Sequence, residues 1–179
     1  MRHKFVMLGL LAALLLAMIS PSFAGRTSAA APAAPAATSS QSHAAIFDKT
    51  RFLIHAGAGF YAFHHFVWAR YKNGGFSASD PHRKSNIVKA VLALAFAYHE
   101  FKVAYRIANN SNSKTLHALI APLNRLGGAV NTVATKLKGG QYSDTDIESL
   151  NDNISSFGKL SGSNGYTIKD KRVPVPGAE

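Results

Sequence analysis

The chain of 179 residues contains no cysteine. This absence excludes disulfide bonds, thiol catalysis, lipoprotein acylation and cysteine-based zinc sites. Acidic residues are also few, because nine Asp and Glu stand against 20 Lys and Arg, for a formal net charge of +11 at pH 7. A protein this basic is attracted to anionic surfaces such as lipid headgroups, wall polymers or nucleic acid. The charge alone selects none of these, and no nucleic-acid-binding module accompanies it, so nucleic acid is not the expected partner.

The first 24 residues have the three parts of a secretory signal peptide. Residues 2–4 are positively charged or titratable, residues 6–19 form an unbroken apolar run, and Ser22 and Ala24 are small residues at positions −3 and −1 of a cleavage site. The apolar run is short for a permanent membrane span. We therefore expect a signal peptide at 1–24 and an extracytoplasmic protein, secreted or held in the cell envelope.

The composition divides the rest of the chain into three parts. Residues 25–43 are mostly Ala, Pro, Ser and Thr, which cannot bury a core, so they are predicted to form a disordered linker. Residues 44–162 carry the apolar periodicity of a folded domain. In residues 163–179, Pro174 and Pro176 exclude a helix, which predicts an extended C-terminal tail.

Four helices are predicted between residues 44 and 162. The first runs from about Ala45 to Tyr71 and is apolar on every side, with charged residues only near its ends. The second opens at Asp80-Pro81 and continues to about Ala108. No alternation typical of strands competes with this pattern. Short polar turns join the four helices, so the expected fold is all-α, an antiparallel four-helix up-down bundle.

The third predicted helix has a strict heptad seam. Its apolar residues recur at alternating spacings of three and four: Leu116, Leu119, Leu123, Leu126, Val130, Val133 and Leu137. Pro122 and Gly127-Gly128 interrupt the sequence of this helix, and they either kink or split it. Since the apolar phase continues unshifted past both, one kinked helix is favoured. The fourth helix begins at Ser143, where Ser143 and Asp146 resemble a capping box.

The first predicted helix contains eight aromatic residues and three histidines between residues 44 and 72. Because it lacks a continuous polar face, it is expected to be the most buried helix of the domain. It also contains Gly57-Ala58-Gly59-Phe60-Tyr61-Ala62, which matches the dinucleotide fingerprint G-x-G-x-x-A. A true fingerprint follows a strand, so we interpret these small residues as a place where another helix packs against the backbone.

A membrane-associated helical hairpin is the alternative architecture. Residues 52–69 carry no formal charge, and residues 87–105 are largely apolar, so the sequence leaves open whether these helices pack in a soluble core or contact a membrane. The connection between them is basic. An anionic envelope surface or a membrane would be contacted through four residues of this region: Arg70, Lys72, Arg83 and Lys84.

The histidines suggest a haem or metal carrier as a second alternative. A bis-histidine haem site needs one histidine from each of two facing helices, and the candidates are His64, His99 and His82. In an antiparallel pair His64 and His99 lie about 15 Å out of level, and His82 is close to an exposed helix start. No His pair has the i, i+4 spacing of helical zinc sites, so no metal site and no cofactor are assigned.

No catalytic constellation is present in the sequence. The aspartates are explained as acids at helix ends, and Gly75-Phe76-Ser77-Ala78-Ser79 lacks the second glycine of a nucleophile elbow. The sequence therefore predicts an exported, basic, cysteine-free helical domain with a non-enzymatic binding or structural role in the envelope or outside the cell. Its binding partner and oligomeric state stay open.

Overall fold

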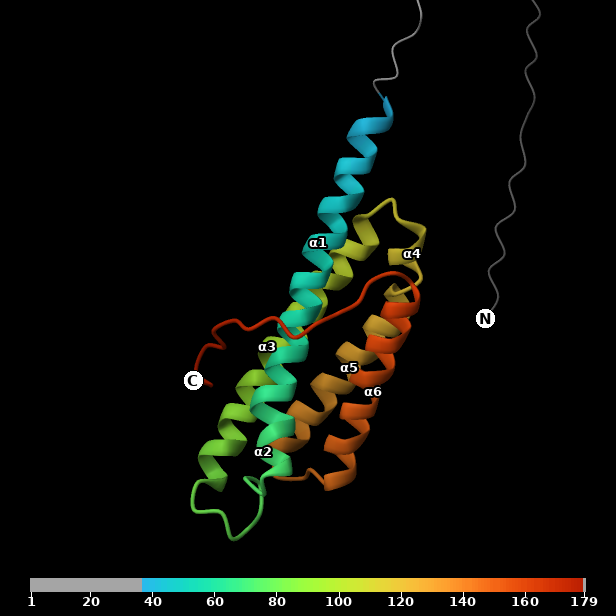
Figure 1. The fold of residues 1–179 in the computed structure, drawn as a ribbon. Coiled ribbons are helices and arrows are strands. Elements are labelled where there is room, and N and C mark those ends of the chain that lie inside the picture. Colours follow the sequence, from blue (N-terminus) through green and yellow to red (C-terminus); the bar gives the residue numbers. More distant parts are fainter. Residues whose placement is uncertain (1–36, 179) are drawn as a thin grey trace, which may run out of the picture. The chain divides into compact units, whose positions relative to one another are not determined.

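The structure is a computed structural model that describes the backbone of residues 37–178 and the side chains from residue 46 onward. Every regular element in this part of the chain is a helix, which confirms the all-helical prediction. Four long helices pack against each other in Figure 1: α1 (Ala37–Phe63), α3 (Arg83–Asn110), α5 (Ile120–Lys138) and α6 (Asp144–Ser163). The predicted signal peptide and residues 25–36 of the predicted linker lie outside the described residues.

The first predicted helix is longer than expected and changes type near its end. It begins at Ala37 rather than near Ala45, because no proline or glycine follows until Gly57 and the intervening residues tolerate a helix. After Phe63 the chain forms a π-helix, η1 (His64–Trp68), and then one further α-helical turn, α2 (Ala69–Lys72). The sequence carries no signal for η1.

Residues 52–68 of this continuous helix are largely buried. Ile54 is the large apolar side chain of this stretch that is exposed, at 43%. No whole face of residues 52–68 is open to water. Among the described residues, no helix is both long and apolar enough to cross a membrane. The buried residues of this stretch are Phe52, Ala56, Gly57, Ala58, Gly59, Phe60, Ala62, Phe63, Phe66 and Val67.

Helix α3 lies between α1 and α5 and packs on both. Its small residues allow this close approach, because alanine side chains let two helix backbones come near. All five alanines on its small face are fully buried: Ala90, Ala93, Ala97, Ala104 and Ala108. Phe101, 1% exposed, extends from the same helix towards α1 and meets Phe60 edge to face at 6.1 Å.

The third predicted helix is split, so the prediction of one kinked helix is wrong. A short helix, α4 (Lys114–His117), ends before α5 begins at Ile120. The break lies just before Pro122, which has no N–H to donate to the carbonyl four residues earlier. Gly127 and Gly128 lie inside α5 without breaking it. The seam itself is confirmed, because all seven of its residues are buried.

Helix α6 begins as predicted. The side chain of Ser143 accepts from the N–H of Asp146, and the Asp146 side chain accepts from the N–H of Ser143, which completes the capping box. Ile147, Leu150 and Ile154 form its buried stripe. One aromatic contact ties α6 to α1, since Phe60 and Phe157 meet edge to face at 6.4 Å.

The C-terminal segment, residues 164–178, has no regular secondary structure and runs across α1 (Figure 1). Its start is fixed by Tyr166, which is 6% exposed and meets the ring of Phe52 edge to face at 5.8 Å. The Tyr166 hydroxyl lies 2.9 Å from the hydroxyls of both Ser113 and Thr115. The end of the segment is fixed by Val175, which is fully buried.

The glycine pair of α1 provides two close approaches on different sides of the helix. At Gly57 a Cβ atom would overlap the backbone oxygen of Lys169, so this glycine admits the C-terminal segment. At Gly59 a Cβ atom would overlap the ring of Phe101, so this glycine admits a side chain of α3. The interpretation of these residues as packing sites is correct for both, although at Gly57 the neighbour is an extended segment and not a helix.

Candidate anion-binding pocket

A pocket of about 430 Å³ lies where the C-terminal segment passes beside η1, α2 and α3. Its walls come from parts of the chain that are far apart in sequence. The residues that line it are Tyr61, His65, Phe66, Arg70, Lys89, Arg172, Val173, Pro174, Val175 and Ala178. The volume is within the range typical of small-molecule sites.

Positive charge is concentrated in this pocket. Arg70, Lys89 and Arg172 line it, beside the imidazole of His65. No acidic residue of the described chain lines the pocket, and neither arginine forms an ion pair there. The like charges of Arg70 and Arg172 repel each other, and a bound anion relieves this repulsion. The site therefore has the electrostatics of an anion-binding pocket.

The pocket also has an apolar wall. Phe66 is 7% exposed, and Val175 and Ala178 are almost completely buried. Pro174 and the half-buried Val173 continue this wall along the C-terminal segment. Phe66, Val175 and Ala178 thus form a packed base, and the accessible apolar surface of the pocket includes Val173 and the exposed Pro174.

The π-helix η1 brings α1 and α2 to the same pocket. The N–H of Ala69 donates to the carbonyl of His64, five residues earlier, where an α-helix would use a residue four earlier. At about 100° per residue, Arg70 would lie about 180° from Tyr61 on a regular α-helix. The π turn contains one extra residue, which reduces the angle between Tyr61 and Arg70 about the helix axis by about 100°. Arg70 and Tyr61 can therefore line one pocket.

The aromatic contacts around η1 show the same rotation of side chains about the helix axis. The rings of Phe63 and Trp68 stack at 6.5 Å with an interplanar angle of 23°, although residues five apart point about 140° apart on an α-helix. Tyr61 and His65 stack at 5.2 Å and 12°, which orients the imidazole at the pocket. π-Helical turns of this kind often occur at functional sites.

The C-terminal segment is held in place beside the pocket by polar contacts to α1 and η1. The N–H of Lys171 donates to the carbonyl of Gly57 at 2.9 Å. Next to it, Nδ1 of His64 lies 2.9 Å from both carboxylate oxygens of Asp170. These two contacts immediately precede Arg172, so they fix the backbone position from which this exposed residue reaches the lining of the pocket.

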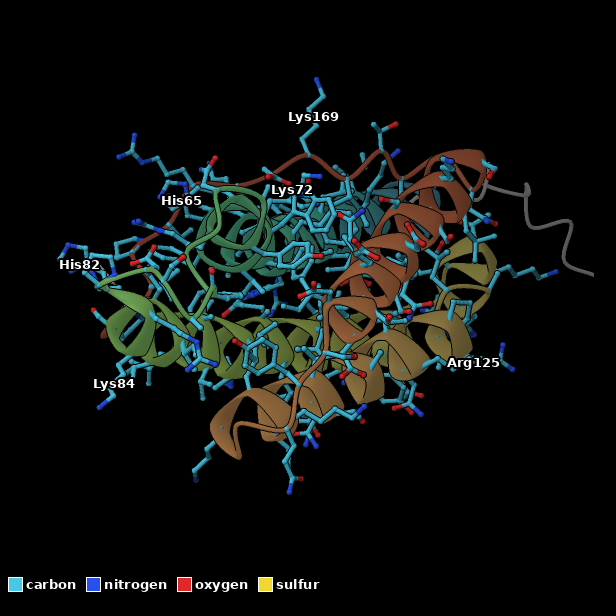
Figure 2. All side chains as sticks on the ribbon, turned by 90° about the horizontal axis from the view of Figure 1, so that it is seen from below. His65, Lys72, His82, Lys84, Arg125 and Lys169 are labelled. Carbon is cyan, nitrogen blue, oxygen red and sulfur yellow. The ribbon has the colours of Figure 1, made fainter. Side chains whose placement is uncertain are left out.

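The three haem candidates have separate surroundings in the structure. His64 is half-buried and bonded to Asp170, whereas His99 is exposed on α3. His82 projects outward at the start of α3 in Figure 2. None of the three lines the pocket described above. Within residues 46–178, no group of three or more His, Cys, Asp or Glu side chains is arranged to hold a metal ion.

The four basic residues expected to contact an anionic surface have different surroundings in the structure. Arg70 lines the pocket, and the ammonium of Lys72 lies 5.6 Å from the ring of Trp68. Arg83 has a structural role, because its Nε donates to the carbonyl of Phe76 at 3.0 Å. Lys84 is exposed and extends away from Lys72 (Figure 2).

A second hollow, of about 420 Å³, lies at the turn that follows α2. Tyr71, Lys72, Tyr142 and Asp144 contribute to its lining, so its charges are mixed. Burial and the hydrogen bond to Glu148 at 2.9 Å raise the pKa of Tyr71 to about 12. The phenol thus stays protonated at neutral pH and offers no base or nucleophile.

Of the cationic residues that line the pocket, the sequence analysis singled out Arg70 alone, and for a different surface. Lys89 and Arg172 were missed because they lie in segments with no local motif. The proximity of Lys89 and Arg172 depends on the path of the C-terminal segment, which no local pattern predicts.

Comparisons with protein-family models, with curated proteins and with solved structures find no match for this chain. The functional argument therefore depends on the pocket alone.

Proposed function

We propose that this protein is an exported, non-enzymatic binding domain that holds an anionic ligand in the pocket beside its C-terminal segment. The observation that carries the proposal is the presence of both Arg70 and Arg172 in one pocket of about 430 Å³ with no acidic residue of the described chain in its lining. Cationic side chains beside an apolar wall bind an organic anion by charge and by burial together.

The extracytoplasmic location is part of the same proposal. It is supported by the signal-peptide pattern of residues 1–24, and the basic composition suits a compartment rich in anionic polymers and lipids. We further propose an antiparallel up-down bundle, because short connections join the successive long helices. Fractionation of cells that express the full chain tests the location, and recovery in the cytoplasmic fraction with residues 1–24 still attached would contradict it.

A binding experiment with two matched variants tests the function. Inorganic phosphate and butyl phosphate are titrated into the full chain by calorimetry at low and at physiological ionic strength. Arg172→Gln is expected to weaken binding at least fivefold, because it removes one charge from the pocket. Lys84→Gln removes the same charge at an exposed position elsewhere, so it is expected to change the affinity less than twofold.

The salt dependence and the comparison of the two variants can each support or contradict the proposed function. Affinity should fall as salt is added, since screening weakens a charge-based contact. If neither anion binds, or if the two variants weaken binding equally, the positive net charge attracts anions without a specific site and the proposed function is wrong.

A further inference from the structure

We infer that the second hollow, where the turn after α2 meets the start of α6, binds a small zwitterion with a methylated ammonium at one end and a carboxylate at the other. This hollow of about 420 Å³ shares no lining residue with the anion-binding pocket. The inference therefore goes beyond the proposed function, and either of the two can fail alone. It follows from the aromatic rings and the two opposite charges that line the hollow.

Three aromatic residues from separate parts of the chain line this hollow. Tyr71 lies in α2, Phe76 in the following turn and Tyr142 just before α6. The rings of Phe76 and Tyr142 are nearly perpendicular, with an interplanar angle of 75° and centroids 6.1 Å apart. Phe76 is buried and forms the base, whereas Tyr71 and Tyr142 are half-buried and retain accessible surface. Aromatic faces attract cations, and several of them together recognise methylated ammonium groups.

Hydrogen bonds hold both tyrosines in place without a ligand. The hydroxyl of Tyr142 donates to the carbonyl of Phe76 at 3.1 Å and accepts from the guanidinium of Arg83 at 3.3 Å. The hydroxyl of Tyr71 donates to Glu148 at 2.9 Å. Because the polar end of each side chain already has a partner, the ring is the part that remains for a ligand. A site that is ordered in advance loses less entropy when it binds.

The charge that acts on Tyr71 is negative. Burial and the hydrogen bond to Glu148 raise the pKa of Tyr71 to about 12, and the charges of Asp144 and Glu148 add to this rise. Asp144 lines the hollow and takes part in none of the ion pairs of residues 46–178. An ammonium group beside the rings is therefore attracted by the aromatic faces and by the Asp144 carboxylate together.

Lys72 adds a positive charge to the same lining. Its ammonium lies 5.6 Å from the ring centroid of Trp68, and no ion pair of the described chain joins it to Asp144. A purely cationic ligand would be repelled by Lys72, and a purely anionic ligand would be repelled by Asp144. A zwitterion avoids both penalties, because its carboxylate can lie towards Lys72 while its ammonium stays beside Asp144 and the rings.

The test compares glycine betaine with two ligands that each lack one of its charges. Each ligand is titrated into the full chain and followed by NMR. In tert-butylacetate a carbon replaces the ammonium nitrogen, and this ligand is expected to bind at least fivefold more weakly than betaine. In choline a hydroxymethyl group replaces the carboxylate. Choline is expected to bind about threefold more weakly, since the hollow is half open and a contact with an exposed lysine contributes little.

Two charge variants assign the ends of the ligand. Asp144→Asn should weaken betaine and choline by the same factor, at least threefold, because both carry the ammonium. Lys72→Gln should weaken betaine about threefold and should not weaken choline. The matched controls are Asp152→Asn and Lys84→Gln, which remove the same charges at exposed positions outside the hollow. Lys84 extends away from Lys72 in Figure 2, and each control should change the affinities less than twofold.

Two variants of Tyr142 separate its ring from its hydroxyl. Both Tyr142→Leu and Tyr142→Phe lose the hydrogen bond to the carbonyl of Phe76, but only the leucine variant loses the ring. Tyr142→Leu should weaken betaine at least threefold, and Tyr142→Phe should weaken it less than twofold. A thermal melt of each variant checks the fold. The comparison of the three ligands needs no variant, so it tests the inference even where Tyr142→Leu unfolds the chain.

The results that would overturn the inference leave the proposed function unaffected. No binding of betaine, or equal binding of betaine and tert-butylacetate, would show that the hollow does not recognise an ammonium group. Equal effects of Asp144→Asn and Asp152→Asn would show that net charge, not a site, attracts the ligand. Binding to phosphatidylcholine vesicles without binding of free betaine would assign the surface to a bilayer instead. Arg172→Gln is expected to leave the affinity for betaine unchanged, because Arg172 does not line this hollow.

Discussion

Two regions of this molecule differ in how far apart in sequence their contacts lie. In the α5–α6 region, a heptad seam and a capping box are formed by residues three to seven positions apart. In the region formed by α1, η1 and the C-terminal segment, the contact of His64 with Asp170 joins residues 106 positions apart. The first region is regular and the second holds the candidate site.

The difference shows what the irregular region requires. Helix α5, which carries the leucine seam, packs against α3 and α6, the long helices that precede and follow it in the chain, so its contacts join elements that are adjacent in sequence. The pocket is lined by the π turn, by α3 and by the C-terminal segment, which crosses α1 at Gly57. Function is thus proposed for the part of the molecule whose geometry depends on the most non-local contacts.

The largest expected effect comes from replacing one glycine with alanine in each region, because the two replacements should change the free energy of unfolding in opposite directions. Gly59→Ala should lower the free energy of unfolding by about 2 kcal/mol, because the new methyl group overlaps the buried ring of Phe101. Gly128→Ala, in α5, should raise it by about 0.5–1 kcal/mol, since nothing lies within 4 Å of the added Cβ and alanine favours a helix. Urea unfolding of both variants measures the two values, and an equal change in both would contradict the contrast.

An intermediate effect is expected at the crossing of the C-terminal segment. Gly57→Ala should displace this segment, because the added Cβ overlaps the backbone oxygen of Lys169. The amide of Lys171, which donates to Gly57, should then exchange with solvent at least tenfold faster, while the helical content stays constant. Anion binding should fall with it, since Arg172 leaves the pocket.

A glycine at the end of α6 provides the control for the displacement. Gly162→Ala adds the same methyl group where nothing lies within 4 Å, so exchange at Lys171 should not change. If Gly57→Ala leaves both the exchange rate and anion binding unaltered, the segment does not depend on this close approach.

The smallest effect is expected in the regular region and depends on pH. The hydrogen bonds from Lys136 and Ser143 hold the pKa of Asp146 at about 2, below its ordinary value of 3.8. A carboxyl group whose pKa is lowered on folding stabilises the fold above its unfolded pKa, and this contribution is lost as the pH falls through the folded pKa. Asp146→Asn should therefore lower the Tm by about 2–4 °C at pH 7 and have almost no effect at pH 2.

The matched control is Asp152→Asn on the same helix, an exposed carboxylate away from the capping box. It should change the Tm by less than about 1 °C at either pH. A difference between Asp146→Asn and the natural chain that persists undiminished at pH 2 would show that the carboxylate charge is not what stabilises the cap.

The places where sequence reasoning failed have physical causes. At Pro122 the apolar phase continues past the break, because the seam of α4 and α5 stays aligned although the helix is interrupted. At η1 the sequence His64–Trp68 has no feature that favours hydrogen bonds to the carbonyl five residues earlier over bonds to the carbonyl four residues earlier. The π turn depends on packing of the aromatic rings against neighbouring helices, which a linear pattern does not contain.

The sequence by itself determined the four long helices of this protein. The apolar periodicity specifies four long helices, Ser143 specifies where α6 begins, and the leucine seam specifies the buried face of α5, because each signal acts between residues at most one or two turns apart. Only the tertiary structure decided the site. The path of residues 164–178 follows from side chains that find partners more than 100 residues away, and that pairing brings Arg172 to the same pocket as Lys89 and Arg70.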